Sequence, residues 1–365
     1  MDTRSHPRTP DCPPTAEARA DILACRAVLR RHARSFHAAS LLLPRAVRDP
    51  AAVLYGFCRV ADDAVDVEGG LDDAIGDLRD RLARAYAGTP RPSPIDRALA
   101  RVVAAHDIPR ILPERLVEGL EWDAEGRRYE TLEDLLDYAS RVAGAVGAMM
   151  AVLMGVRSSS GLARACDLGV AMQLSNIARD VAEDAAIGRL YLPAAWMREA
   201  GLDPAAWLAR PRPSTALEGV VARLLAVADE LYERAAAGIG ELPLACRPGI
   251  NAARLLYAAI GHAVARAGSA SMARRVGVSK WQRAWLLSRA VATPWPRARG
   301  RHAPALPANA ALVRAAQRED REGGEGGRED GRVRTGGAGF VIDLLMRLEH
   351  EERGRRVPRA QELAR

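Results

Sequence analysis

Hydrophobic residues recur along most of the chain at the three- and four-residue spacing of amphipathic α-helices, and no long stretch alternates as a β-strand does. Asp49 and Pro50 match a helix start, with Asp as the N-cap and Pro in the first turn, for a helix that ends at Glu68. GRLYLP (188–193) is expected to be an irregular connection. The fold class is therefore all-α. Other helices are predicted over about 16–32, 71–87, 94–106, 113–124, 131–154, 159–185, 203–239, 247–271 and 279–292.

The two ends of the chain differ in composition from the helical body, which we expect to be one domain over 16–293. Residues 1–15 are polar and Pro-rich, which predicts a disordered N-terminus and no signal peptide. Residues 294–338 are rich in Pro, Gly, Arg and Glu, which predicts a flexible linker. The remainder, 339–365, begins with GFVIDLLMRLEH, a short amphipathic helix that docks on the body or lies on a membrane surface.

Composition and charge narrow the function classes. The net charge is +7 and the pI is about 9.5, but Lys280 is the only lysine, so almost all positive charge is Arg. This bias, together with abundant Ala and Gly, is typical of a GC-rich genome, so we predict no nucleic-acid partner. The five cysteines show no C-x-x-C spacing, which favours reduced thiols in a cytoplasmic protein. No uninterrupted apolar run reaches about eighteen residues, so no membrane-spanning helix is expected.

The segment YGFCRVADDAVD (55–66) places acidic residues on a helix that is otherwise almost wholly apolar. Tyr55, Arg59, Asp62 and Asp66 fall within an arc of about 60° around that helix. Such a narrow polar stripe is expected to face an internal cavity or cleft rather than open solvent. Asp63 lies off this face, where it would support the site or meet solvent.

The same arrangement recurs 118 positions later in MQLSNIARDVAED. Gln173, Asn176, Asp180 and Asp184 share an arc of about 80° on a second apolar helix. Arg179 points away from this stripe on a helical wheel, so we do not predict it among the ligands. Two such stripes facing one cavity would line it with carboxylates.

Carboxylates in a largely apolar site require a cation. A single D-x-x-x-D on a helix is usually a solvated face, but two of them on apolar helices are harder to explain in that way. His and Cys are absent from both stripes, which argues against zinc. Oxygen ligands suit Mg²⁺, which bridges carboxylates to substrate phosphates. The pattern therefore indicates a small Mg²⁺ cluster that holds a diphosphate.

Several motifs together resemble one family, the squalene/phytoene synthases, and within it the bacterial 15-cis-phytoene synthases. The resemblance covers roughly residues 20–295. The family often has a second aromatic residue two positions after Tyr138, where this chain has Ser140. The motifs that carry the resemblance are RSFHAAS (34–40), LYGFCRVADDAVD (54–66), RVAGAVG (141–147), QLSNIARDVAED (173–184), GRLYLP (188–193) and RVGVSKWQR (275–283).

The resemblance implies an isoprenoid synthase fold around a central cavity. The implied activity is phytoene synthesis, the first committed step of carotenoid biosynthesis. Two geranylgeranyl diphosphates would join head to head through prephytoene diphosphate, release diphosphate and form 15-cis-phytoene. The implied cofactor is Mg²⁺, with Mn²⁺ as an alternative ion, and phytoene formation needs no NADPH.

The resemblance also assigns roles to individual residues. Asp62, Asp66, Asp180 and Asp184 are the implied catalytic and metal-binding acids, and Asn176 is an implied metal ligand. The remaining implied substrate-binding residues, at the diphosphate end or along the cavity, are Arg34, Ser35, Phe36, Tyr55, Arg59, Gln173, Tyr257 and Arg275.

Other functions stay open at this point. A squalene, hydroxysqualene or dehydrosqualene synthase acting on farnesyl diphosphate would use the same motifs. A terpene cyclase would leave RVAGAVG and GRLYLP unexplained, and a chain-elongating prenyltransferase would need DDxxD sites. A non-catalytic assembly protein of the same fold would be free to lose its acids. Because substrate and product are lipids, we expect peripheral contact with the inner face of the cell membrane and with other carotenoid-pathway enzymes.

Overall fold

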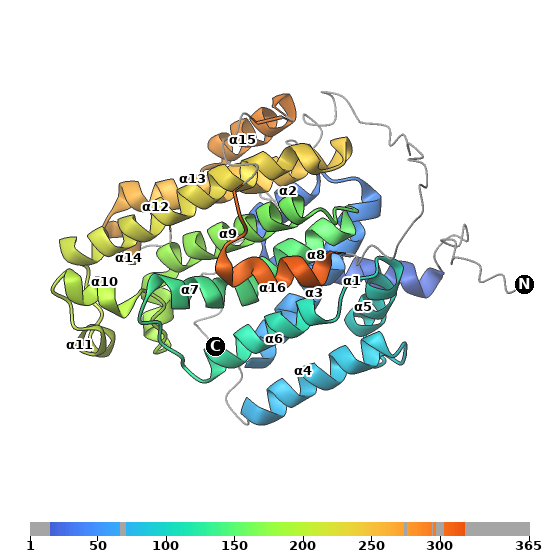
Figure 1. Ribbon diagram of the computed structural model, residues 1–365, viewed down its shortest axis with the longest axis horizontal. Helices are drawn as coiled ribbons and strands as arrows, with labels where there is room; N and C mark the ends of the chain where they lie inside the picture. The colour runs from blue at the N-terminus through green and yellow to red at the C-terminus, as the bar shows by residue number, and fades with distance from the viewer. Residues whose placement is uncertain (1–14, 66–70, 274–275, 294, 297–302, 318–365) are drawn as a thin grey trace, which may run out of the picture.

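The computed structural model describes residues 15–65, 71–273, 276–293, 295–296 and 303–317 (Figure 1). These residues form helices and contain no β-strand, which confirms the predicted all-α class. The α-helices are α1 Ala16–His32, α2 Arg34–Ser40, α3 Arg45–Val65, α4 Leu71–Tyr86, α5 Pro94–Ala105, α6 Ile111–Ala124, α7 Leu132–Ala139, α8 Ala145–Leu153, α9 Ser159–Ala186, α10 Ala194–Glu199, α11 Pro204–Ala209, α12 Thr215–Gly238, α13 Arg247–Ala267, α14 Ala270–Ala273, α15 Lys280–Ala292 and α16 Ala310–Ala316. The shorter helical turns are η1 Ser140–Gly144, a π-turn, and the 3₁₀ turns η2 Ile239–Glu241, η3 Leu244–Cys246 and η4 Pro307–Asn309.

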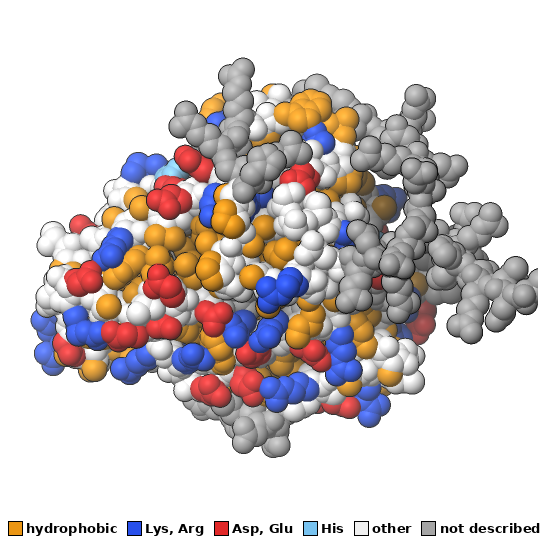
Figure 2. All heavy atoms as spheres, viewed as in Figure 1, with side chains coloured by type: hydrophobic (Ala, Val, Ile, Leu, Met, Phe, Trp, Pro, Cys, Tyr) orange, Lys and Arg blue, Asp and Glu red, His pale blue; other side chains and the backbone are white. Residues whose placement is uncertain are grey.

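Helix α9 lies in the middle of the fold, with α8, α12, α13 and α16 packed against it (Figure 1). It joins two hydrophobic clusters. Leu162 and Cys166 belong to the cluster formed with α3, α5 and α6, whereas Leu174 and Ile177 belong to the cluster formed with α10 and α12. Because its apolar residues are fixed on both sides, α9 holds its polar stripe in a defined orientation. On the molecular face in Figure 2, side chains of both charges are intermixed over α4, α6 and α7.

The π-turn η1 and helix α8 approach α9 so closely that no side chain fits between the backbones at two positions. A β-carbon on Gly147 would lie 2.2 Å from the carbonyl oxygen of Ala165. A β-carbon on Gly169 would lie 2.1 Å from the carbonyl oxygen of Ala143. Both distances are far shorter than van der Waals contact, so glycine is required for this backbone-to-backbone packing.

Two predicted helix boundaries are wrong. Helix α3 begins at Arg45, so Asp49 and Pro50 lie inside it, and the Asp49 carboxylate accepts a hydrogen bond from Arg26 Nε at 2.8 Å instead of capping the helix. The helix predicted over 203–239 is divided into α11 and α12. The break contains Pro211 and Pro213, which cannot donate the backbone hydrogen bonds of a continuous helix.

A C-terminal segment, residues 303–317, packs on the body of the fold. Its helix α16 contacts α6, α8 and α9, and Leu312 and Ala316 are buried there. The prediction of a flexible linker over 294–338 is therefore wrong for these residues, because their apolar side chains complete the core. The helix predicted at 339–350 lies outside the described residues.

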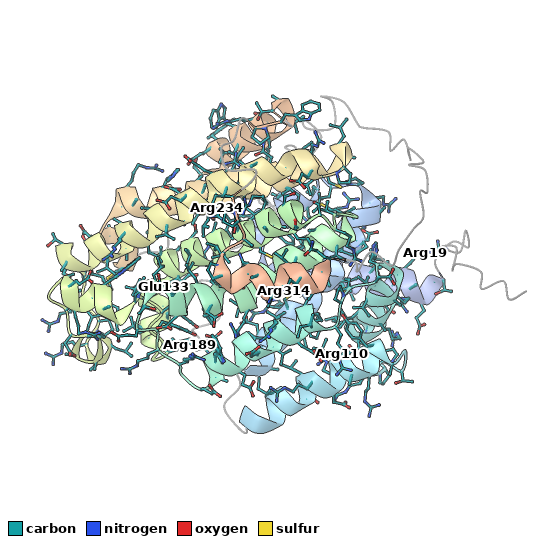
Figure 3. The ribbon with its side chains drawn as sticks, viewed as in Figure 1. Arg19, Arg110, Glu133, Arg189, Arg234 and Arg314 are labelled. Atoms are coloured by element: carbon teal, nitrogen blue, oxygen red, sulfur yellow. The ribbon has the colours of Figure 1, made fainter. Side chains whose placement is uncertain are left out.

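A buried ion pair holds this segment in place. Arg164 and Asp167 of α9 lie 2.9 Å apart and are almost fully buried. Arg234 of α12, labelled in Figure 3, donates from Nε to Asp167 at 3.0 Å and from its other end to the carbonyl oxygen of Pro304 at 2.7 Å. Arg164 donates to the carbonyl oxygen of Ala303 at 2.9 Å. The charges are thus paired, and their remaining donors bind the returning chain.

The continuous helical stretch Leu132–Leu153 is long and apolar enough to cross a bilayer by length and composition alone. Within it, 61% of the apolar window is buried inside the fold, and α8 packs on α6 and α9. Core helices of soluble proteins have the same character, so this stretch is weak evidence for a membrane span.

We expect Gly169→Ala to lower the melting temperature by several degrees, because overpacking a close helix contact costs about 1–3 kcal/mol. Gly76→Ala in α4 is the matched control, since nothing lies within 4 Å of the added β-carbon. That control should gain about 0.5–1 kcal/mol of stability. Thermal unfolding followed by circular dichroism measures both, and a Gly169→Ala protein as stable as the parent would contradict the close approach.

Candidate active site

An apolar cavity of about 290 Å³ runs through the bundle beside α9. Helix α9 contributes Gly161, Ala165, Leu168, Met172 and Asn176 to its wall, a span of about 22 Å at the rise of an α-helix. The other walls come mainly from α3, α8, α12 and α13. Such a long apolar cavity is suited to a hydrocarbon chain rather than to a compact polar molecule.

Polar side chains gather at one end of this cavity. Tyr55 of α3, Gln173 and Asn176 of α9 and Tyr257 of α13 all line it, as does Phe36 of α2. The Phe36 and Tyr55 ring centroids lie 6.0 Å apart. Burial, with a smaller contribution from Tyr257, raises the pKa of Tyr55 to about 12. Five of the predicted residues are thus brought together by four helices.

The acidic residues follow directly beyond this polar end. Asp180 and Asp184 lie one and two turns after Asn176 on α9, and Asp62 lies two turns after Tyr55 on α3. Burial, with a smaller contribution from the Asp180 carboxylate, raises the pKa of Asp184 from 3.8 to about 7. The Asp62 side chain is 47% exposed and that of Asp180 is 17% exposed, which places the acids at a mouth of the cavity.

A further acid at this mouth was not predicted from the sequence. Asp123 of α6 accepts hydrogen bonds from the hydroxyls of Tyr138 and Tyr191, both at 2.8 Å. Burial raises its pKa to about 6, although these two hydrogen bonds lower it, and the charge of Asp62 contributes to the rise. Asp123 in turn raises the pKa of Asp184. Acids from α3, α6 and α9 therefore act on one another across one site.

Ser140 does not take the place of a second aromatic ring beside Tyr138. Its hydroxyl donates to the carbonyl oxygen of Ala308 at 2.9 Å and so faces the returning C-terminal segment. The ring partners of Tyr138 are Tyr129 and Tyr191, whose centroids lie 5.1 Å and 5.2 Å from its own. The aromatic cluster is thus assembled from three separate segments of the chain.

Arginines neutralise part of this negative charge. Arg59 donates to Asp62 at 2.8 Å and also pairs with Asp63, which is exposed. The prediction that Arg179 points away from the acidic stripe is wrong, because its long side chain turns back and donates from Nε to Asp180 at 2.7 Å. Arg189, labelled in Figure 3, lowers the pKa of Asp184.

The other predicted residues are placed only in part. Arg34 begins α2 and Ser35 follows it, on the helix that also carries Phe36. Asp66 and Arg275 lie outside the described residues.

The donor set fits a hard divalent cation. The described candidates are carboxylate and amide oxygens only, and burial raises the pKa of two of the acids at this site, Asp123 and Asp184. No three His, Cys, Asp or Glu side chains in the described ranges lie close enough together to hold an ion by themselves. An ion bound here would therefore complete its coordination with water and phosphate oxygens, as Mg²⁺ usually does.

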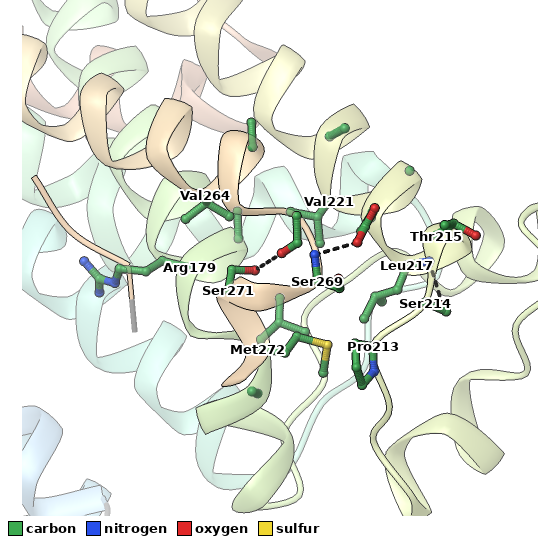
Figure 4. Close-up of a pocket in the computed structure, with 18 residues that line it drawn as sticks. Arg179, Pro213, Ser214, Thr215, Leu217, Val221, Val264, Ser269, Ser271 and Met272 are labelled. Carbon is green, nitrogen blue, oxygen red and sulfur yellow. Dashed lines mark hydrogen bonds between the residues drawn. The ribbon is translucent and has the colours of Figure 1, made fainter. Parts of the chain in front are cut away.

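A second pocket, of about 320 Å³, lies between α9, α12, α13 and the segment that leads into α14 (Figure 4). Its polar groups bind one another, since Glu218 accepts from the backbone N–H of Ser269 at 2.5 Å and Ser271 donates to the carbonyl of Gly268 at 2.7 Å. Arg179 borders it, but the guanidinium extends away from the other labelled residues. This pocket offers no convergent catalytic groups, so the acidic end of the long cavity is the candidate active site.

Comparisons with known proteins agree with this geometry. The family model of squalene/phytoene synthase matches residues 29–282. The chain is 56% identical over 274 residues to the phytoene synthase of Rhodobacter capsulatus, which covers 74% of this chain and 81% of that relative. It is 49% identical over 351 residues to the phytoene synthase of Cereibacter sphaeroides, covering 92% and 96%.

Solved structures give the same result for the fold. A dehydrosqualene synthase in complex with a ligand superimposes with a TM-score of 0.70 at 28% identity, covering 76% of this chain and 97% of that one. A squalene synthase from Alicyclobacillus acidocaldarius gives a TM-score of 0.64 at 28% identity over 70% and 97%. The matched family, the fold and the acidic mouth of the apolar cavity lead to one conclusion: the chain belongs to the squalene/phytoene synthase family.

Proposed function

We propose that the chain is a phytoene synthase that joins two geranylgeranyl diphosphates head to head, through prephytoene diphosphate, and releases diphosphate to form 15-cis-phytoene. The relatives at 49–56% identity support this activity. The structural observation that carries it is the apolar cavity whose one end is lined by Tyr55 and Tyr257 and leads to interacting acids on α3, α6 and α9. The prenyl chains would occupy the cavity and their diphosphates would lie at its mouth.

The acids at the mouth would hold Mg²⁺ against the diphosphates. Asp62 would contribute from α3, and Asn176, Asp180 and Asp184 from α9, with Asp66 as the further ligand expected from the sequence. Mg²⁺, when bound, neutralises the leaving diphosphate and so lets the allylic C–O bond ionise.

The protein's own residues do the rest. Arg59 pairs with Asp62, from where it would donate charge-assisted hydrogen bonds to phosphate oxygens. Val146, Met150 and Met172 line the cavity and would keep water away from the carbocation. Asp123, held by two tyrosine hydroxyls, would keep Tyr138 and Tyr191 oriented at the reacting end. Phytoene formation ends with loss of a proton and uses no reductant.

A C30 synthase acting on farnesyl diphosphate is the second candidate. The observation that favours it is the structural likeness to a dehydrosqualene synthase and a squalene synthase at 28% identity. The higher identity to two phytoene synthases, 56% and 49%, favours the C20 substrate.

We expect Asp62→Asn and Asp180→Asn each to lower phytoene formation by at least about 100-fold, because each removes a charge that would hold the metal. The assay incubates the purified chain with geranylgeranyl diphosphate and Mg²⁺, without NADPH, and separates the extracted products by chromatography. Asp80→Asn is the control, since Asp80 forms exposed ion pairs on α4. The proposal would be contradicted if the parent chain turned over neither geranylgeranyl nor farnesyl diphosphate and if EDTA did not change its binding of these diphosphates.

In EDTA, Asp184→Asn should raise the melting temperature at about pH 8 by about 2 °C or more, and less at about pH 5. The folded pKa of Asp184 is about 7 against an ordinary 3.8, so the unfolded chain loses this proton first. The free energy of unfolding therefore falls as the pH rises from about 4 to about 7, and the loss reaches its full size above about pH 7. The amide removes this penalty. Calorimetry at both pH values tests it, and equal or lower stability of the variant at pH 8 would contradict the buried charge.

Ala165→Leu is expected to lower turnover of geranylgeranyl diphosphate at least about tenfold while affecting farnesyl diphosphate less. Ala165 lines the cavity about 16 Å along α9 from Asn176, so the added methyl groups would meet only the far end of the longer chain. Competition between the two substrates, with the products quantified, gives the ratio. An equal loss of turnover for both substrates would show that this end of the cavity does not determine which chain length is used.

A further inference from the structure

Helix α15 is apolar on both its faces, which is unusual for a helix at the surface of a fold. Leu286, Leu287 and Ala290 are buried, and α15 packs on α13. The opposite face carries Trp281 and Trp285, four residues apart, which are 82% and 58% exposed. Figure 2 shows hydrophobic side chains gathered where α15 lies at the top of the view.

The charged residues of the sequence segment that carries this helix are all basic. Residues 269–301 contain no acidic residue. Arg289 lies on the same face as the two tryptophans, with its guanidinium carbon 5.4 Å from the Trp285 ring centroid. Trp295, which follows the helix, is 62% exposed, and Arg247 lies 5.3 Å from its ring centroid. The basic residues of this segment are Arg274, Arg275, Lys280, Arg283, Arg289, Arg297, Arg299 and Arg301.

We propose that Trp281, Trp285 and Arg289, the tryptophan face, dock the protein on the surface of an anionic lipid bilayer. Tryptophan rings favour the interface between headgroups and acyl chains, and basic residues are drawn to anionic lipids. The lipid nature of substrate and product, which rests on the proposed function, gives such docking a purpose. The binding itself requires no catalysis.

A second copy of the chain fits this face less well. In a two-fold dimer the same patch meets itself, so the basic residues of one copy would face those of the other, and residues 269–301 offer no acid to pair with them. A bilayer containing anionic lipid instead presents negative charge to these basic residues. It also accepts a convex helix, whereas a protein partner would need a matching groove.

The tryptophan face is close to the substrate cavity. Helix α13 packs against α15 and also contributes Ile250, Ala253 and Tyr257 to the cavity wall. Two packed helices, α15 and α13, each about 10 Å thick, therefore separate a docked bilayer from the cavity. Lipid substrate and product would then move between membrane and cavity over a short distance.

The test is co-sedimentation of the full-length chain with vesicles of neutral phosphatidylcholine that contain about one third anionic phosphatidylglycerol. Trp281→Ser combined with Trp285→Ser should lower the partition coefficient at least about tenfold. The matched control is Leu23→Ser on α1, another exposed apolar side chain at 60%, which should bind as the parent does. Arg289→Gln should weaken binding at low salt and have little effect at high salt.

Circular dichroism establishes that each variant is folded, and turnover in detergent solution separates this proposal from the proposed function. The double variant should retain that turnover. Three results would overturn the proposal: no vesicle binding by the parent chain, undiminished binding by the double variant, or a dimer in sedimentation equilibrium that the double variant abolishes. The last result would assign the face to a second copy.

Discussion

Carboxylates from three helices lie so close together at the mouth of an apolar cavity that their charges repel one another. Asp62, Asp123 and Asp184 come from α3, α6 and α9, and burial together with mutual repulsion raises the pKa of the latter two. A fold gains no stability from such a cluster. The arrangement is understandable as a site that awaits positive charge, and the packing around α9 maintains it.

That packing depends on small residues where helices meet. Gly147 and Gly169 let the backbones of α8 and η1 touch that of α9, which brings their cavity-facing side chains to the same wall. The buried pair of Arg164 and Asp167 then ties the returning C-terminal segment to α9. Helix α9 thus carries the polar stripe, part of the apolar cavity wall and the ion pair that binds the segment 303–317. Its position leaves little freedom for the acids to move apart.

Features that depend on local periodicity could be predicted from the sequence. The all-helical class and the two polar stripes follow from residues four apart, and the structure brings Tyr55 and Asn176 to one cavity as that spacing predicts. Asp123 could not be found in this way, because it is one of four acids on α6 and its partners at the site come from other segments of the chain. Arg179 was misjudged because a helical wheel ignores how far a long side chain can turn back. The order of 303–317 depends on contacts that composition does not reveal.

The most direct measurement is the anomalous scattering of Mn²⁺ in a crystal of the chain with an unreactive geranylgeranyl thiodiphosphate. We predict Mn²⁺ peaks at the cavity mouth, in contact with oxygens of Asp62, Asp180 or Asp184 and of the diphosphate, with the prenyl chain along α9 towards Ala165. Mn²⁺ bound elsewhere, or a diphosphate bound at the mouth with no metal beside it, would contradict the assignment of these acids to a metal–diphosphate site.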